Sequence, residues 1–212
     1  MKGIMPNTQI HGLPIFPVDA HIFPGGKLKL RIFESRYIRL VKERSSLDPA
    51  FAIAMYSHVM VGQQPQLLKV ATTVKIIDFE NLEDGFLGIT VEGVGLVSIL
   101  SVMTESDGLH IAECDLLTHW NQDTADFDEG HTEYLTQKLR SLYMEYPDFS
   151  ALYPSLKQDL NWLVMRWLEL LPVPSDLKVE MLQEKDASNA VMLVRMMIEA
   201  SEKNLSDPDD LS

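Results

Sequence analysis

The alternation of hydrophobic and polar positions changes about halfway along the chain. Up to about residue 118, short apolar runs rich in β-branched residues are separated by turn signals such as Asp84-Gly85 and Ser106-Asp107-Gly108. Such runs are typical of strands joined by hairpins. Several strands at short spacing predict a compact, curved β structure with few exposed edges. The expected strands are residues 50–56, 67–79, 86–91, 96–103 and 109–117.

Residues 13–37 combine several structural signals in one stretch. Pro14 and Pro17 interrupt its first apolar run, which we interpret as a short edge strand because proline cannot donate to a sheet ladder. Gly25 and Gly26 then predict a turn that needs φ > 0. Residues 27–32 alternate as in a half-buried strand, and a helical spacing follows. The expected buried face of this helix consists of Phe33, Tyr37, Leu40 and Val41.

From about residue 123 onward the apolar period is helical. Asp126 with Glu129 is typical of an N-cap followed by a capping-box acid. Residues 160–171 carry apolar side chains at the spacing of one helix face, and the prolines at 172 and 174 end that helix. Ser175 can cap the next one. Short amphipathic helices cannot each bury a face alone, so we expect them to pack as a bundle.

These patterns predict an α+β fold in three parts. Residues 1–118 are expected to form a β-rich subdomain with one helix, and residues 119–204 a helical bundle. The acidic tail, residues 205–212, is expected to be disordered because it has little apolar surface to bury.

Composition narrows the classes of partner. The 212 residues are 46% hydrophobic, which is enough for a substantial core, and the formal charge is −13. An acidic chain is repelled by phosphate, so we expect no nucleic acid and no anionic membrane as partners. No apolar run approaches the roughly 18 residues of a membrane span. Cys114 is the single cysteine, which fits a reducing, cytoplasmic location.

Residues 13–37 also carry a family resemblance. The motifs occur in the order Leu13-Pro14-Ile15-Phe16-Pro17, Phe23-Pro24-Gly25-Gly26, Leu30-Arg31-Ile32-Phe33-Glu34, then Arg36 and Tyr37. This order is similar to the opening of the Lon N-terminal (substrate-binding) domain family. Residues 71–76, 84–93 and 170–172 resemble it too, so the likeness covers roughly residues 10 to 200. It implies a PUA-like pseudo-barrel followed by a helical bundle. The sequence departs from the family at Lys29, Ser35, Ala71 and Leu96-Val97, and any binding role of the family's Arg-Phe at that last pair does not carry over.

The resemblance implies recognition of protein substrates without proteolysis. Neither a P-loop nor a Ser-Lys peptidase signature occurs, and Gly25-Gly26-Lys27-Leu28 lacks the first glycine and the hydroxyl of a P-loop. We therefore expect a stand-alone, non-enzymatic protein- or peptide-binding module, with an adaptor or chaperone-like role in protein quality control. Its expected partners are unfolded polypeptide segments or a protein partner, and no cofactor is expected. The alternative is a small hydrolase with a site assembled from scattered residues. RNA binding rests only on analogy with PUA-like folds.

Four residues are candidates for peptide contact. Arg31, Glu34 and Arg36 are expected to form a local ion-pair network at the strand-to-helix corner, and the alternative is that Glu34 and Arg36 form a polar rim for a bound peptide. Trp162 and Met165 lie off the main apolar stripe of their helix, where they either cover a second packed surface or form an exposed patch. Cys114 is expected to be a small buried hydrophobe.

Two other groups of polar residues have ordinary interpretations. The acidic residues at 78, 80, 83 and 84 are close enough for acid-base work, but beside a Gly turn they are more typical of a solvated loop. The scattered histidines show no metal-binding spacing.

Overall fold

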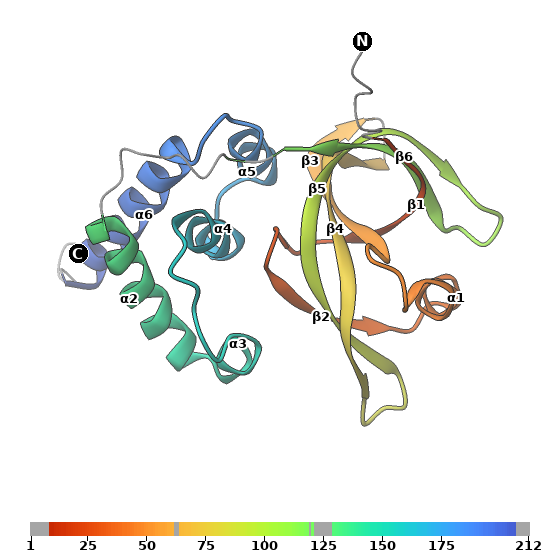
Figure 1. Ribbon diagram of the computed structural model, residues 1–212, viewed down its shortest axis with the longest axis horizontal. Coiled ribbons are helices and arrows are strands. Elements are labelled where there is room, and N and C mark those ends of the chain that lie inside the picture. Colours follow the sequence, from red (N-terminus) through yellow and green to blue (C-terminus); the bar gives the residue numbers. More distant parts are fainter. Residues whose placement is uncertain (1–8, 62–63, 119, 121–128, 207–212) are drawn as a thin grey trace, which may run out of the picture. The chain divides into compact units, whose positions relative to one another are not determined.

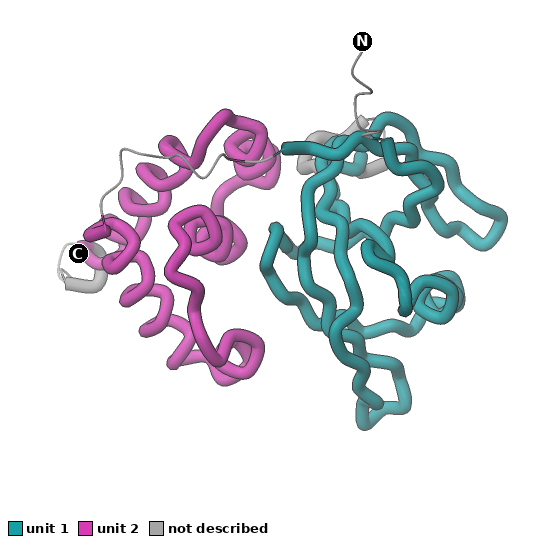
Figure 2. Tube along the Cα trace, viewed as in Figure 1, with its two compact units in different colours: residues 1–118 teal, residues 119–212 magenta. Residues whose placement is uncertain are grey.

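The computed structural model describes residues 9–61, 64–118, 120 and 129–206. The chain forms two compact units, residues 1–118 and residues 119–212 (Figure 2). The first unit contains a six-stranded sheet and one helix, and the second is helical (Figure 1). The predicted α+β class, with strands before helices, is therefore confirmed.

The β unit contains seven elements. In chain order they are β1 Gln9–Val18, β2 Lys27–Ile32, α1 Ser35–Arg44, β3 Phe51–Val61, β4 Gln64–Asn81, β5 Leu87–Thr104 and β6 His110–Leu117. The sheet order is β2-β5-β4-β3-β1-β6, and β5 pairs in addition with β6. β4 and β5, each 18 residues long, curve together along the unit (Figure 1).

Closure of the sheet depends on the length of β5. Its first part pairs with β2 from Leu87 to Glu92, and its second part pairs with β6 from Leu96 to Thr104. β4 pairs along the length of β5, from Asn81 opposite Leu87 to Val70 opposite Ser98. The strands β5, β4, β3, β1 and β6 therefore close a ring, and β2 extends the sheet beside the first part of β5.

β1 corrects one expectation. The prolines predicted an edge strand, but β1 pairs in parallel with β3 and antiparallel with β6. Pro14 lies opposite Ile111 and Pro17 opposite Ala54. Each proline removes only one donor, and the other residues of β1 supply the ladders on both sides. A register shift between Ile10 and Leu13 also shows that the ladder with β6 is interrupted near the first proline.

Two apolar clusters hold the β unit together. Small side chains from all five strands of the ring form the first, which consists of Leu13, Ile15, Ala52, Ala54, Ala71, Val97, Ala112 and Cys114. The second joins α1 to the sheet and includes Tyr37, Leu40 and Val41 from the helix with Leu30, Ile32, Ile89 and Val91 from β2 and β5. In the turn between β1 and β2, Gly25 has a positive φ of 75°, as predicted, whereas Gly26 does not have a positive φ.

The helical unit contains five helices in its described residues. They are α2 Glu129–Glu145, α3 Pro147–Leu152, α4 Leu160–Leu170, α5 Ser175–Leu182 and α6 Ser188–Ser206. Asp159 caps α4 by accepting a hydrogen bond of 2.7 Å from the backbone N–H of Trp162. Pro174, rather than Ser175, is the N-cap of α5. The N-cap expected at Asp126 lies outside the described residues, and α6 continues to Ser206, into the expected tail.

Candidate functional site

Two phenylalanines lie side by side on the surface where β2 and β5 begin to separate. Ile32 is opposite Leu87 in the last pair of this ladder, so Phe33 and Phe86 are the next residues outward. Their rings meet edge to face, with centroids 6.3 Å apart. Phe33 is 60% exposed and Phe86 39%. Phe33 was expected on the buried face of α1, but that helix begins only at Ser35. Phe33 therefore lies between β2 and α1, and its side chain faces solvent.

Ionic and polar contacts fix this aromatic pair. The guanidinium of Arg31 lies 4.6 Å from the centroid of the Phe86 ring, and its Nη2 is 2.7 Å from Oδ2 of Asp84. The other carboxylate oxygen of Asp84 accepts a hydrogen bond of 3.1 Å from the backbone N–H of Phe86. We call Arg31, Phe33, Asp84 and Phe86 the aromatic corner. The Phe86 ring is therefore held in place while it faces solvent, and Phe33 packs against it.

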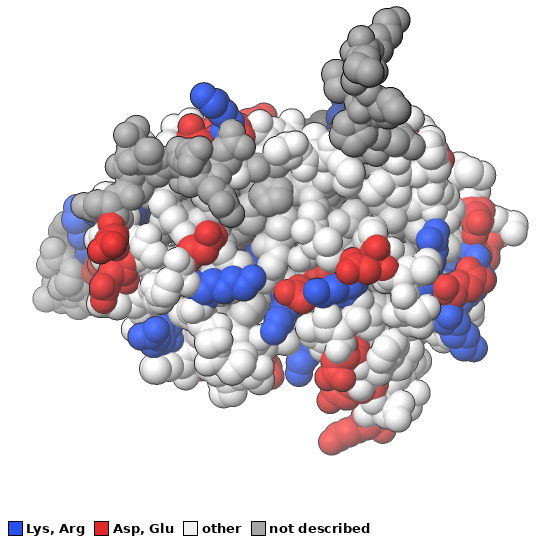
Figure 3. All heavy atoms as spheres, in the orientation of Figure 1, with Lys and Arg blue, Asp and Glu red and all other residues white. Residues whose placement is uncertain are grey.

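The β4–β5 hairpin carries further exposed apolar and acidic side chains. Ile77 and Phe79 of β4 are 41% and 52% exposed. The side chains of Asp78, Glu80 and Glu83 are exposed as well, but only Glu83 lies in the expected loop, because Asp78 and Glu80 belong to β4. Figure 3 shows acidic side chains gathered toward the tip of this hairpin. The surface is thus apolar and negatively charged.

Glu34 and Arg36 form an ion pair at the strand-to-helix corner, as one of their two interpretations predicted, whereas Arg31, expected in the same network, pairs with Asp84. Nη2 of Arg36 is 2.8 Å from Oε2 of Glu34, and Nη1 donates a hydrogen bond of 2.7 Å to the carbonyl of Gly108. The guanidinium also lies 4.7 Å from the centroid of the Tyr37 ring. Arg36 therefore ties the start of α1 to the β5–β6 turn. A role for these two residues as a polar rim for peptide stays a prediction.

The placement of Trp162 and Met165 argues against the contact role that the sequence suggested. Both side chains are buried, with 7% and 2% of their surface exposed. The Trp162 ring meets Tyr153 edge to face at 5.8 Å, and the Arg166 guanidinium lies 5.3 Å from the centroid of the Trp162 ring. A peptide could reach either side chain only after this packing opened. The packed-surface interpretation agrees better with the structure.

Apart from the aromatic corner, the β unit has a recess between the β3–β4 and β5–β6 hairpins. It has a volume of about 420 Å³, and Tyr56, Leu67, Val102 and His110 are among its lining residues. Nδ1 of His110 is 3.0 Å from Oγ1 of Thr104, its cross-strand partner. Burial, with a smaller effect of the Arg36 charge, lowers the pKa of His110. A hydroxyl beside a neutral imidazole is the start of a nucleophile-base pair, although cross-strand pairs of this kind also stabilise sheets.

The structure also shows the surroundings of Cys114 and of the residue types that bind metals. Cys114 is buried in the small-residue cluster, and burial raises the pKa of its thiol to about 11, so its predicted role as a buried hydrophobe is confirmed. Within residues 9–61, 64–118, 120 and 129–206, no three His, Cys, Asp or Glu side chains gather as a metal site would need. No helix in this part of the chain is long and apolar enough to span a membrane.

Comparison with known proteins identifies the family. The family model of the ATP-dependent protease La (LON) substrate-binding domain matches residues 12–200. The chain belongs to this family. The expectation from residues 13–37 is thereby confirmed, and the match covers most of both units. The name describes a substrate-binding module of the protease.

Solved structures of Lon N-terminal domains share the fold. The Lon N-terminal domain protein from Xanthomonas campestris is 24% identical, with a TM-score of 0.65 over 88% of this chain and 98% of that one. The N-terminal domain of Mycobacterium avium complex Lon protease is 9% identical, with a TM-score of 0.54 over 86% of this chain and 95% of that one. At these identities the likeness concerns the fold alone.

Membership of the family does not say which surface of this chain binds a partner, so the binding surface is inferred from this chain's own residues. Leu96 and Val97, at which the sequence was expected to depart from the family, are both buried, so this chain uses the position for packing. The sequence did not single out Arg31 or Phe86 as contacts. The available signal was the aromatic residue directly after Asp84-Gly85, but only the ladder register shows that Phe33 lies beside it.

Proposed function

We propose that this protein is a non-enzymatic module that binds extended, unfolded polypeptide segments at the aromatic corner. The observation that carries the proposal is the exposed Phe33–Phe86 pair, in which Arg31 and Asp84 hold Phe86 and Phe33 packs against it. A role as an adaptor or chaperone in protein quality control, in the cytoplasm and without nucleic-acid or membrane partners, belongs to the same proposal.

Exposed aromatic rings that are already fixed suit a binding surface. Aromatic side chains dominate the energetics of protein interfaces when a partner covers them. Ordering loose side chains normally costs part of the binding free energy, and the contacts around Phe86 reduce that cost in advance. Phe79 and Ile77 add exposed apolar area on the neighbouring strand.

The charge of the hairpin indicates which segments bind best. Asp78, Glu80 and Glu83 are exposed on the same hairpin, and Asp84 already contacts Arg31. A segment with apolar residues flanked by Lys or Arg would satisfy both features, because complementary charge speeds association and disfavours acidic competitors. We therefore propose basic-apolar segments as the preferred ligands of the aromatic corner.

Fluorescence anisotropy with the whole protein can test this proposal. The probe is a labelled peptide in which Phe and Leu alternate with Lys, and the control probe has Ser in place of every apolar residue. We expect Phe33→Ser combined with Phe86→Ser to weaken binding of the first probe by about tenfold or more. Met103→Ser is the matched control, because Met103 is 64% exposed in the same unit. Thermal melting checks that each variant folds.

Two results would contradict the proposal. Equal binding of the two probes would show that apolar side chains are not recognised. Equal loss in the Met103→Ser control and in the double variant would show non-specific adhesion rather than binding at the aromatic corner.

A hydrolase is the second candidate, because of the Thr104–His110 pair. Among the described residues, no carboxylate contacts the other ring nitrogen, as a triad would require. Thr104→Val tests this alternative. Hydrolysis of a generic ester that disappears in this variant, with melting unchanged, would rank the hydrolase first.

A further inference from the structure

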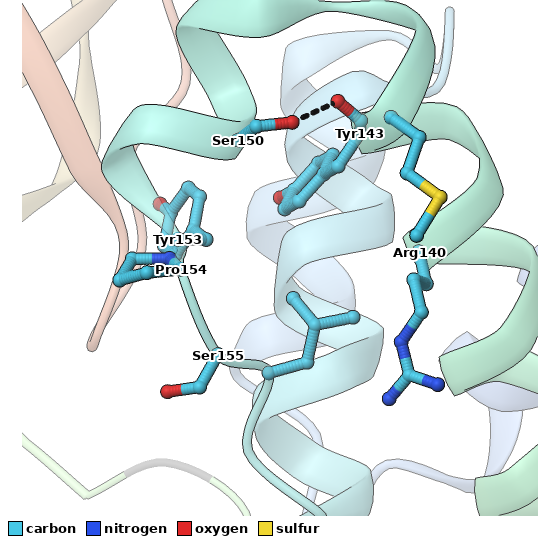
Figure 4. A pocket seen from close by; sticks show the side chains of 8 residues that line it. Arg140, Tyr143, Ser150, Tyr153, Pro154 and Ser155 are labelled. Carbon is cyan, nitrogen blue, oxygen red and sulfur yellow. Dashed lines mark hydrogen bonds between the residues drawn. The ribbon is translucent and has the colours of Figure 1, made fainter.

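The helical unit contains a pocket that the proposed function does not use. Its volume is about 430 Å³, within the usual range for ligand sites. One wall is a face of α2, and the other is the connecting segment after α3. The principal lining residues are Arg140, Tyr143 and Met144 of α2 with Tyr153, Pro154 and Ser155 of the segment. Figure 4 shows Tyr143 between Arg140 on one side and Tyr153 with Pro154 on the other.

A stack of aromatic rings forms the base of this pocket. Tyr143 stacks on Phe149 with centroids 5.3 Å apart and on Tyr153 with centroids 5.2 Å apart. Tyr153 in turn meets Trp162 edge to face. The hydroxyl of Ser150 donates a hydrogen bond of 2.5 Å to the carbonyl of Tyr143, which fixes the end of α2 against α3. The base is therefore aromatic and closely packed, and its two lining rings, Tyr143 and Tyr153, suit contact with a large apolar or aromatic side chain.

Arg140 is exceptional among the arginines in the described part of the chain. Five others form ion pairs with carboxylates, and Arg44 donates to the carbonyl of Gly12. Arg140 makes no such contact with any described residue, although the chain has 31 acidic residues. Arg140 is exposed, and a guanidinium without a carboxylate partner beside a recess with an aromatic base is suited to a ligand carboxylate, which it can bind through two parallel hydrogen bonds.

The opposite wall offers hydrogen bonds from the main chain. Residues 153–159 lie between α3 and α4 and belong to neither helix. Among the described residues, no hydrogen bond reaches the backbone of Ser155, Leu156 or Lys157. Unpaired backbone N–H and C=O groups along one wall can pair with the main chain of an extended peptide.

We propose that this pocket binds a large apolar side chain that has a carboxylate beside it in a polypeptide. The apolar side chain packs on Tyr143 and Tyr153, and the carboxylate pairs with Arg140. Two sources supply this chemistry, namely a chain end with its free carboxyl group and an internal Asp or Glu next to the apolar residue. The choice of a polypeptide as the ligand rests on the proposed function, whereas the aromatic base and the free guanidinium do not depend on it.

Fluorescence anisotropy of the whole protein with labelled Gly-Ser peptides tests the inference. One probe ends in Phe with a free carboxylate, a second is its C-terminal amide, a third ends in Ala, and a fourth has an internal Phe-Asp and an amide end. We expect the free acid ending in Phe to bind about tenfold more tightly than the amide or the Ala peptide. Arg140→Gln should remove this advantage. Lys185→Gln, which makes the same charge change at an exposed position of the unit, should preserve it.

The fourth probe decides between the two sources. Binding as tight as that of the free acid assigns the pocket to internal acidic residues as well, and weak binding assigns it to chain ends. The inference is overturned if the amide binds as tightly as the acid, if Ala replaces Phe without loss, or if Arg140→Gln and Lys185→Gln behave alike. Phe33→Ser with Phe86→Ser should leave the free-acid peptide unaffected, so failure at the aromatic corner is distinguishable from failure here.

Discussion

Arg36 and Gly108 join two parts of the β unit that are 72 residues apart in the sequence, through a hydrogen bond of 2.7 Å. Gly108 lies in the β5–β6 turn with φ = 89°, and a Cβ added there would come within 2.9 Å of Nη1 of Arg36. The β4–β5 turn has the same construction, with Gly85 at φ = 82° after an aspartate, but nothing lies within 4 Å of its Cβ position. The two turns therefore differ in one respect, because the Arg36 guanidinium packs against Gly108 and no described residue packs against the Cβ position of Gly85.

This pair of turns gives a matched test of stability. Gly85→Ala should cost about 1 kcal/mol, because an L residue is strained at positive φ. Gly108→Ala should cost more, about 2–3 kcal/mol, because it adds displacement of Arg36 to the same strain. Urea unfolding of both variants measures the difference. Equal losses would mean that the Arg36 contact yields without cost.

Arg36 and Arg39 both connect α1 to the β5–β6 turn, but by different means. Arg36 donates to a backbone carbonyl, whereas Arg39 pairs with the carboxylates of Glu105 and Asp107. We expect Arg36→Ala to lower the free energy of unfolding by about 1–3 kcal/mol at any salt concentration, because it leaves a part-buried carbonyl unsatisfied. Arg39→Ala should have the smaller effect, and high salt should abolish that effect. Urea unfolding with and without NaCl separates the two. A loss in Arg36→Ala that disappears with salt would contradict this assignment.

The buried amine of Lys178 should make stability depend on pH. Burial lowers the pKa of Lys178 from 10.5 to about 8, and Glu169 opposes this shift. Between these two pH values the unfolded chain retains a proton that the folded protein has released. The free energy of unfolding should therefore rise as pH increases from about 8 to about 10.5.

Lys178→Met isolates this contribution from that of the tyrosines, which titrate in an overlapping range. The variant should be more stable than the parent at pH 7, by up to about 3 kcal/mol, and the difference should vanish above pH 10.5. Thermal and urea unfolding of both proteins across this range provide the measurement. A difference independent of pH would show that the amine is solvated in the folded protein.

Cys114 should be chemically inert in the folded protein. Its side chain is 1% exposed, and a pKa of about 11 leaves little thiolate at pH 8. Alkylation by iodoacetamide should be roughly a hundredfold or more slower than in urea, where the thiol is ordinary. Mass spectrometry of timed samples gives both rates. Comparable rates would show that the small-residue cluster opens readily.

The sequence predicted those features that depend on local periodicity. The helical face of Leu163, Val164, Trp167 and Leu168 is buried as expected, and the hairpin turns after Asp84 and Asp107 are present. The family-specific order of residues 13–37 identified the fold family correctly. These signals come from neighbouring residues, so no knowledge of tertiary contacts was needed.

The features that the sequence did not predict all depend on pairing between distant segments. Pro14 and Pro17 suggested an edge strand because the sequence shows that each lacks a backbone donor. The sequence does not show that β1 has a partner strand on each side. Phe33 was assigned to a helix face because its spacing fits one. Its exposure follows from the end of β2 and from the neighbouring β5 turn. Likewise, Arg140 gives no local sign that it lacks a carboxylate partner.

The ring of the β unit has a consequence for synthesis of the protein. β1 leaves the ribosome first, but it pairs with Ala52–Met55 of β3 and with β6, where Gln9 lies opposite Asp115. Both ladders join distant parts of the chain, and such topologies fold slowly. The nascent chain must therefore keep the apolar stretch around Ile15 and Phe16 unpaired until β3 has emerged, and the ring stays open until β6 follows. During that interval this segment resembles the unfolded polypeptides that the finished module is proposed to bind.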